Sequence, residues 1–203
     1  MNPLFNLEEV NFQRLSSYLK YHTNSTDITQ NDCFFIMVDI QDKFQDIIHD
    51  MESVVKNTDI LNKAAEMLDI PFLYTEQSPE KLGKTIKDIH IPENAVYFSK
   101  TMFSIFTEEV KEYIQNQHKP VLVIYGIEAH ICITQTCLDA IKNAYHVLLV
   151  TDAISSRKEY SKKTAIKMLR DKGIEVVTTE MLLFRLLKDA THPKFREISK
   201  LVK

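Results

Sequence analysis

The chain has 203 residues, of which 28 are acidic and 25 basic, so its formal net charge is -3. This balance argues against a nucleic-acid partner, which normally requires a basic face. No apolar run approaches the roughly 20 residues of a membrane span, and the amino terminus lacks the pattern of a signal peptide. Three cysteines are too few for a disulfide framework, and an odd number cannot all pair within the chain. We therefore predict a cytoplasmic protein with neither a nucleic-acid nor a membrane partner.

Residues 1–30 are predicted to form a helical extension, with a helix over about Leu7–Tyr21 and a polar loop over Thr23–Asp32. Residues 31–203 are predicted to form one domain, because a chain of this size can bury a full core. Within it, short and continuous apolar runs are typical of parallel strands that are buried on both faces. The six predicted strands are Phe34–Val38, Pro71–Tyr74, Ala95–Phe98, Val121–Tyr125, Val147–Val150 and Ile174–Val177.

Segments with helical spacing separate these runs, and local signals mark several helix ends. Thr107 precedes two acidic residues and predicts an N-cap. Ser156, with Glu159 three residues later, matches a capping box, and Gly173 predicts the end of that helix. The alternation of strands and helices predicts a three-layer α/β/α fold around a six-stranded parallel sheet with strand order 3-2-1-4-5-6. Ligands of such sheets bind beyond the carboxyl ends of the strands, where the strand order reverses.

Three reactive side chains are predicted to lie at that edge. Asp39 ends the first strand, Lys100 follows the third on a connection that crosses back, and Cys132 begins a helix that runs to about Ala144. A helix N-terminus and a nearby lysine favour a thiolate, and a carboxylate can act as general base and then general acid. Taken singly, each residue also has an ordinary explanation. Cys132 can be a thiol of the core, Asp39 can cap a turn, and Lys100 can be a solvated surface lysine.

The motifs around these residues resemble those of the isochorismatase-like cysteine hydrolases. The chain resembles this family in its strand ending Asp39-Ile40-Gln41-Asp42-Lys43-Phe44, in Lys100 followed by Phe103-Ser104-Ile105-Phe106, and in the turn Gly126-Ile127-Glu128-Ala129-His130-Ile131-Cys132. The resemblance runs from about Cys33 to the end of the chain. Within the family, the chain is similar, more narrowly, to the subgroup called isochorismatase domain-containing proteins 1 and 2. The matching segments there are Thr75–Pro79, Leu82-Gly83, Asp152–Arg157 and Asp189–Phe195.

This resemblance implies a catalytic triad of Asp39, Lys100 and Cys132. It also implies a cis peptide bond before Glu128, with the backbone N–H groups of Glu128 and Cys132 forming an oxyanion hole. Other members carry an Asp-x-His metal motif after the second strand, but this chain has Thr75-Glu76-Gln77-Ser78 there. We therefore expect no metal, no cofactor and no nicotinamidase activity. Cys132 argues against hydrolysis of isochorismate, because true isochorismatases lack this cysteine.

Four further residues are candidates for contact with a substrate. Gln77 ends the second strand beside Asp39, and it either lines the pocket or bonds neighbouring turns. Phe44 and Phe103 are close to the triad in the chain, although phenylalanine more often packs into a core. His130 either touches substrate or caps the following helix.

The sequence thus predicts a hydrolase that acts on a small amide or related acyl compound through a thioester on Cys132. A non-catalytic interaction protein that retains the fold is the alternative. In either case we expect a homo-oligomer, because amphipathic helices at the end of the chain can supply an interface.

Overall fold

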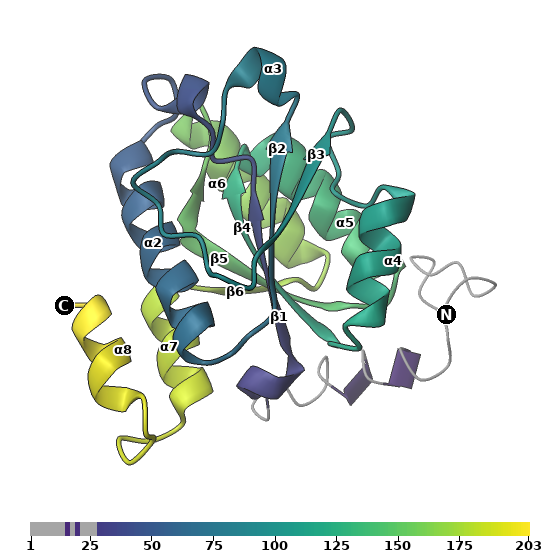
Figure 1. Cartoon of the computed structure of the whole chain (residues 1–203). Coiled ribbons are helices and arrows are strands. Elements are labelled where there is room, and N and C mark those ends of the chain that lie inside the picture. The colour runs from purple at the N-terminus through teal and green to yellow at the C-terminus, as the bar shows by residue number, and fades with distance from the viewer. Residues whose placement is uncertain (1–14, 17–18, 21–27) are drawn as a thin grey trace.

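The computed structural model describes residues 15–16, 19–20 and 28–203, and it has one central sheet with helices on both faces (Figure 1). The expected helix over Leu7–Tyr21 lies largely outside the described residues. The strands are β1 (Cys33–Val38), β2 (Phe72–Gln77), β3 (Val96–Lys100), β4 (Val121–Ile127), β5 (His146–Ser155) and β6 (Glu175–Val177). The helices are α2 (Met51–Met67), α3 (Pro79–Leu82), α4 (Glu108–Asn116), α5 (Thr134–Lys142), α6 (Glu159–Asp171), α7 (Thr179–Leu187) and α8 (Phe195–Leu201). Short 3-10 turns are η2 (Gln30–Asp32) and η3 (Asp42–Phe44), and a π turn, η4 (Ala129–Ile133), precedes α5.

The six strands are parallel and lie in the order β3-β2-β1-β4-β5-β6. The predicted fold class and strand order are therefore confirmed. Every residue of β1 and β4 is buried, which is why these strands read as unbroken apolar runs in the sequence. Since the order reverses between β1 and β4, the residues that follow these two strands meet at the carboxyl edge of the sheet.

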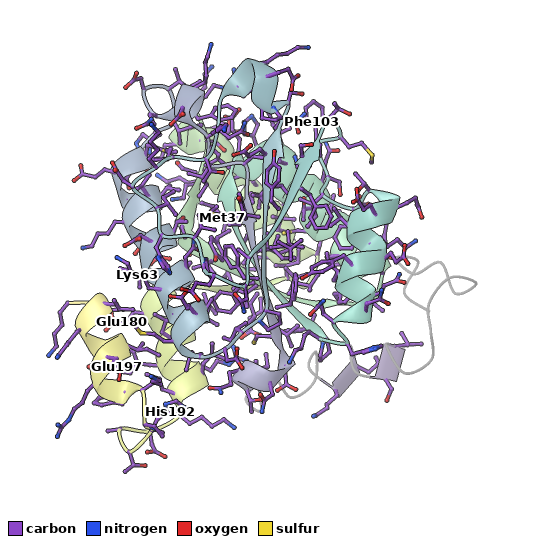
Figure 2. The ribbon with its side chains drawn as sticks, in the orientation of Figure 1. Met37, Lys63, Phe103, Glu180, His192 and Glu197 are labelled. Atoms are coloured by element: carbon purple, nitrogen blue, oxygen red, sulfur yellow. The ribbon has the colours of Figure 1, made fainter. Side chains whose placement is uncertain are left out.

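Two sets of helices complete the three layers. Helices α2 and α7 cover one face of the sheet, with α8 packed against α2, and α4, α5 and α6 cover the other face (Figure 1). Figure 2 shows Met37 among the strands and Phe103 near the upper ends of β2 and β3. Within the part of the chain that the structure describes, no helix is both long and apolar enough to cross a membrane.

The helix-end signals have mixed outcomes. The Thr107 side chain accepts a hydrogen bond from the Val110 N–H and so caps α4 as predicted. Gly173 follows the end of α6 with a φ of 87°. The prediction of a capping box at Ser156 is wrong, because α6 begins at Glu159 and the residue before it, Lys158, is the N-cap. Ser156 is instead buried, since β5 continues to Ser155 and carries it into the interior.

Candidate active site

Asp39 follows β1 with a left-handed backbone, at a φ of 54°. Aspartate tolerates this conformation better than most side chains do. The Asp39 N–H donates to the Thr75 carbonyl at 3.0 Å, and the Thr75 hydroxyl donates to Asp39 Oδ1 at 2.8 Å. The residue is only 1% exposed. The carboxylate is therefore held in one orientation at the carboxyl edge of the sheet.

Lys100 is the last residue of β3 and pairs with Gln77 of β2. The prediction that it lies on a connection after the strand is therefore wrong. Its side chain spans β2 instead, because a lysine stem is long enough to cross one neighbouring strand. Nζ lies 2.6 Å from Asp39 Oδ2 and 2.8 Å from Gln77 Oε1. The carbonyl oxygens of Met102 and Phe103 also accept from Nζ, each at 3.2 Å. The ammonium is thus paired and hydrogen-bonded although it is buried.

Cys132 lies within the π turn and not at the first residue of an α-helix as expected, because α5 begins only at Thr134. The Ile131 and Ile133 N–H groups both donate to the Glu128 carbonyl, which closes the turn around the cysteine. The Thr134 hydroxyl donates to the Ala129 carbonyl at 2.7 Å. π turns of this kind occur frequently at functional sites.

The pKa of the Cys132 thiol is raised to about 12, chiefly because the group is buried. The negative charge of Asp39 and a hydrogen bond to its carboxylate raise it further, whereas Lys100 and the Glu128 N–H act in the opposite direction. Desolvation thus outweighs the effects of the lysine and of the Glu128 N–H on the pKa of this thiol. A hydrogen bond to the Asp39 carboxylate is among the causes that favour the protonated thiol.

The turn before Cys132 depends on a close approach of two strands. Gly126 has a φ of 122°, and a Cβ atom there would lie 2.1 Å from the Val38 carbonyl oxygen. The peptide bond between Ile127 and Glu128 is cis. Beyond it, the Glu128 N–H donates toward the Cys132 sulfur. The chain thus leaves β4 with a backbone donor directed at the thiol.

Known proteins share the sequence pattern and the fold of this chain. The isochorismatase domain model matches residues 33–181. The chain belongs to the isochorismatase family. Isochorismatase domain-containing protein 2 of Danio rerio is 38% identical over 168 residues, covering 82% of this chain and 85% of that protein. Its name confirms the likeness to the subgroup expected from the sequence.

Two further relatives widen the comparison. A protein of Phytophthora sojae named secreted isochorismatase effector Isc1 is 34% identical and covers 81% of each chain. A solved structure described as MAR1 ribonuclease from Caenorhabditis elegans has a TM-score of 0.83 and 31% identity, covering 86% of this chain and 91% of that one. The family and its fold support a hydrolase-type function for this chain.

Within this isochorismatase fold, the four predicted substrate contacts lie in different settings. Gln77 Oε1 accepts a hydrogen bond from Lys100 Nζ, and Gln77 Nε2 donates to the Thr101 carbonyl at 2.8 Å. Phe44 is half-buried against the core in η3, while Phe103 is 51% exposed. His130 Nδ1 lies 2.9 Å from the Ser156 hydroxyl. Gln77 therefore supports the lysine.

Two residues that shape this isochorismatase site received no role from the sequence. Thr75 orients Asp39, and Gln41 joins β1 to the neighbouring turns. Gln41 Nε2 donates to the carbonyls of Gln77 and Gly83, and its Oε1 accepts from the Gln77 N–H. The Asp-x-Gln spacing of the first motif was the available signal for Gln41. A threonine on a buried strand offered no such signal.

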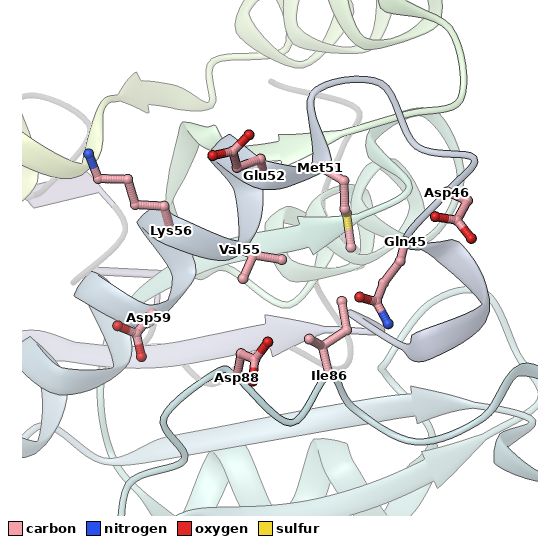
Figure 3. Close-up of a pocket in the computed structure, with 9 residues that line it drawn as sticks. All are labelled: Gln45, Asp46, Met51, Glu52, Val55, Lys56, Asp59, Ile86 and Asp88. Atoms are coloured by element: carbon pink, nitrogen blue, oxygen red, sulfur yellow. The ribbon is translucent and has the colours of Figure 1, made fainter.

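A cavity of about 480 Å³ lies beside the start of α2 (Figure 3). None of the predicted site residues lines it. Its wall consists of Gln45, Asp46, Met51, Glu52, Val55, Lys56, Asp59, Ile86 and Asp88. Four of these residues carry carboxylates. In the part of the chain that the structure describes, however, no three or more His, Cys, Asp or Glu side chains are placed to hold a metal.

Proposed function

We propose that the protein is a cysteine hydrolase, which cleaves a small amide or related acyl compound through a thioester on Cys132. The observation that carries this proposal is the buried ion pair of Asp39 and Lys100, 2.6 Å apart, whose carboxylate also contacts the Cys132 thiol. A buried ion pair is costly to desolvate and weak as a source of stability, so its presence beside a thiol favours a chemical role.

In the first half-reaction, the Cys132 sulfur attacks the carbonyl carbon while Asp39 takes the thiol proton. A general base assists this attack because burial raises the pKa of the thiol. The backbone N–H groups of Glu128 and Cys132 stabilise the oxyanion. Collapse of this intermediate breaks the carbon–nitrogen bond, and Asp39 returns the proton to the leaving amine. The products are a thioester and free ammonia or amine.

In the second half-reaction, a water molecule attacks the thioester carbonyl. Asp39 takes a proton from the water and returns it to the departing sulfur, which restores the thiol and releases the carboxylic acid. Lys100 stays charged throughout and holds the carboxylate in place. The cycle thus consumes one water and needs neither a metal nor a cofactor.

A panel of small amides screened for ammonia release tests this proposal. The wild type should hydrolyse at least one of them, and Cys132→Ala should abolish that turnover. Cys137→Ala is the matched control, since Cys137 is a fully buried thiol on α5. Full turnover by Cys132→Ala would contradict covalent catalysis. RNA belongs in the same panel, because a related structure is described as a ribonuclease.

The rival function is a non-catalytic interaction protein that retains the hydrolase fold. It predicts no Cys132-dependent turnover of any amide in the panel. We further propose that the protein works in the cytoplasm as a homo-oligomer with a small-molecule substrate. Fractionation of the source cells tests the location, for which the secreted Phytophthora sojae relative is the counterexample, and light scattering tests the oligomeric state.

A further inference from the structure

The outer side of α7 leaves two large apolar side chains in contact with solvent. Met181 is 59% exposed and Phe184 is 39% exposed, and residues three apart lie on the same side of a helix. The other side of α7 consists of Leu182, Leu183 and Leu186, which are buried in the core. The helix is therefore apolar on two sides, of which the described part of the chain covers one. An exposed apolar patch of this kind marks a surface for association.

A hollow adjoins this patch, between the end of α7 and the beginning of α8. The rings of Phe184 and Phe195 meet edge to face in its wall, with 6.1 Å between their centroids. Its volume is about 260 Å³, and its full lining is Phe184, Leu187, Lys188, Asp189, Ala190 and Phe195. Mostly apolar hollows beside a patch receive single anchoring side chains at protein interfaces.

The patch and the hollow are arranged symmetrically about Phe184, as a contact between two copies of the chain requires. In a two-fold dimer, each residue of the contact surface meets a residue of the same surface on the partner. When two α7 helices cross in opposite directions at Phe184, the residue three positions before it faces the residue three positions after it. Met181 then faces Leu187 of the partner subunit, and Leu187 lines the hollow. The flexible side chain of methionine suits an irregular hollow.

The charges at the two ends of the patch follow the same symmetry. Glu180 is four residues before Phe184 and Lys188 is four residues after it, about one helical turn in each direction. Both are exposed, and among the described residues the structure records no ion pair for either. The neighbouring Asp189 is engaged in its own turn, where its carboxylate accepts from the Thr191 N–H and hydroxyl. In the antiparallel arrangement, Glu180 lies opposite the partner subunit's Lys188, which gives two ion pairs around an apolar centre.

The patch is remote from the proposed active site. Figure 2 shows Glu180 beside α7 at the lower left, whereas Phe103, whose carbonyl accepts from Lys100, is at the top of the view. Helices α7 and α8 lie together at that lower left corner (Figure 1). A second copy bound there leaves the carboxyl edge of the sheet open to a substrate.

We propose that the outer side of α7, with the hollow beside α8, is the interface of a two-fold homodimer. Phe184 lies on the two-fold axis, Met181 enters the hollow of the partner, and Glu180 and Lys188 form the charged rim. This inference rests on the homo-oligomer that is part of the proposed function, and it names the surface through which two copies meet.

Light scattering of the full-length protein during size-exclusion chromatography measures the assembly. The wild type should have at least the mass of a dimer, and Met181→Glu should reduce that mass by half or more, because it places an unpaired carboxylate in each hollow. Tyr160→Glu is the matched control and should leave the mass unchanged, since Tyr160 is 78% exposed on α6, on the other face of the sheet. An oligomer that persists in Met181→Glu would overturn this interface and leave the homo-oligomer standing. A wild type that is monomeric would overturn both and assign the patch to a different protein.

An exchange of charges tests the symmetry of the contact. Glu180→Lys should raise the Kd of the dimer at least about tenfold, because it places like charges opposite each other at both ends of the patch, and Lys188→Glu should do the same. The double variant Glu180→Lys with Lys188→Glu restores both pairs in reverse, so its Kd should return to within about threefold of the wild-type value. Sedimentation equilibrium measures these constants. A double variant as weak as the single ones would overturn the antiparallel arrangement.

A cysteine on the axis gives a covalent readout. Phe184→Cys should form a disulfide-linked dimer on mild oxidation with copper phenanthroline, because a residue on a two-fold axis lies beside its own copy. Tyr160→Cys is the control and should stay unlinked on a non-reducing gel. The native thiols Cys33, Cys132 and Cys137 are buried and do not compete. A Phe184→Cys protein that is dimeric by light scattering but forms no link would overturn the position of Phe184 on the axis.

Discussion

Lys100 Nζ lies 2.6 Å from Asp39 Oδ2, although the two residues belong to strands that are separated by β2. Lys100 is at the end of the edge strand β3, and its stem crosses β2 beside Gln77 to reach the residue that follows β1. Both side chains are almost completely buried. The pair is therefore a fixed part of the carboxyl edge, against which the Cys132 thiol is placed.

Asp39→Asn removes the proposed general base while keeping the size of the side chain. We expect kcat to fall by roughly 10²- to 10⁴-fold, the usual contribution of a positioned proton acceptor. Ammonia release under saturating substrate measures the loss. Asp42→Asn, at an exposed position three residues later, should leave kcat within about twofold. Retention of kcat in Asp39→Asn would contradict the assignment of the base.

Lys100→Met leaves the Asp39 carboxylate buried without its cation. The free energy of unfolding should fall by about 3–5 kcal/mol, as it does when one partner of a buried pair is removed. Urea unfolding followed by circular dichroism measures this change. The double variant Asp39→Asn with Lys100→Met should be more stable than Lys100→Met alone, because the unpaired charge is gone. An additive double variant would show that the two groups are not coupled.

The raised pKa of Cys132 makes alkylation of the resting protein slow at neutral pH. With a thiol pKa of about 12, the thiolate fraction is far smaller than that of free cysteine, whose pKa is about 8.5. The rate of iodoacetamide modification, followed by mass spectrometry, should rise about tenfold for each pH unit between pH 7 and 10. A plateau below pH 8 would indicate a resting thiolate. Cys137, which is fully buried, reports unfolding during the same experiment.

Gly126→Ala should disrupt the approach of β1 to β4. The added Cβ would lie 2.1 Å from the Val38 carbonyl oxygen, at a backbone φ of 122° that L-residues rarely adopt. We expect a loss of at least about 2 kcal/mol in the free energy of unfolding, or failure to fold. Gly83→Ala is the control: its Cβ would be 3.3 Å from the Asp42 Cβ, so its cost should be nearer 1 kcal/mol. Equal losses in the two variants would contradict this account.

The local pattern of the chain was sufficient for the framework. Continuous apolar runs predicted all six strands. The physical reason is plainest in β1 and β4, which are buried along their whole length, whereas the edge strand β3 is partly exposed. The strand ends were missed by up to five residues at β5, which continues to Ser155. There the pairing with β4 shifts between Ile124 and Gly126, and polar residues such as Asp152 are accommodated within the strand. A hydrophobic run cannot reveal this irregularity.

The sequence by itself also determined which reactive residues stand at strand ends, since Asp39, Lys100 and Cys132 each follow or end an apolar run. Only the tertiary structure decided how they are presented. The left-handed backbone of Asp39, the reach of Lys100 across β2 and the π turn around Cys132 all depend on contacts between distant segments. The raised pKa of the thiol depends on them most, because burial and charge are properties of the packed site and not of the local chain.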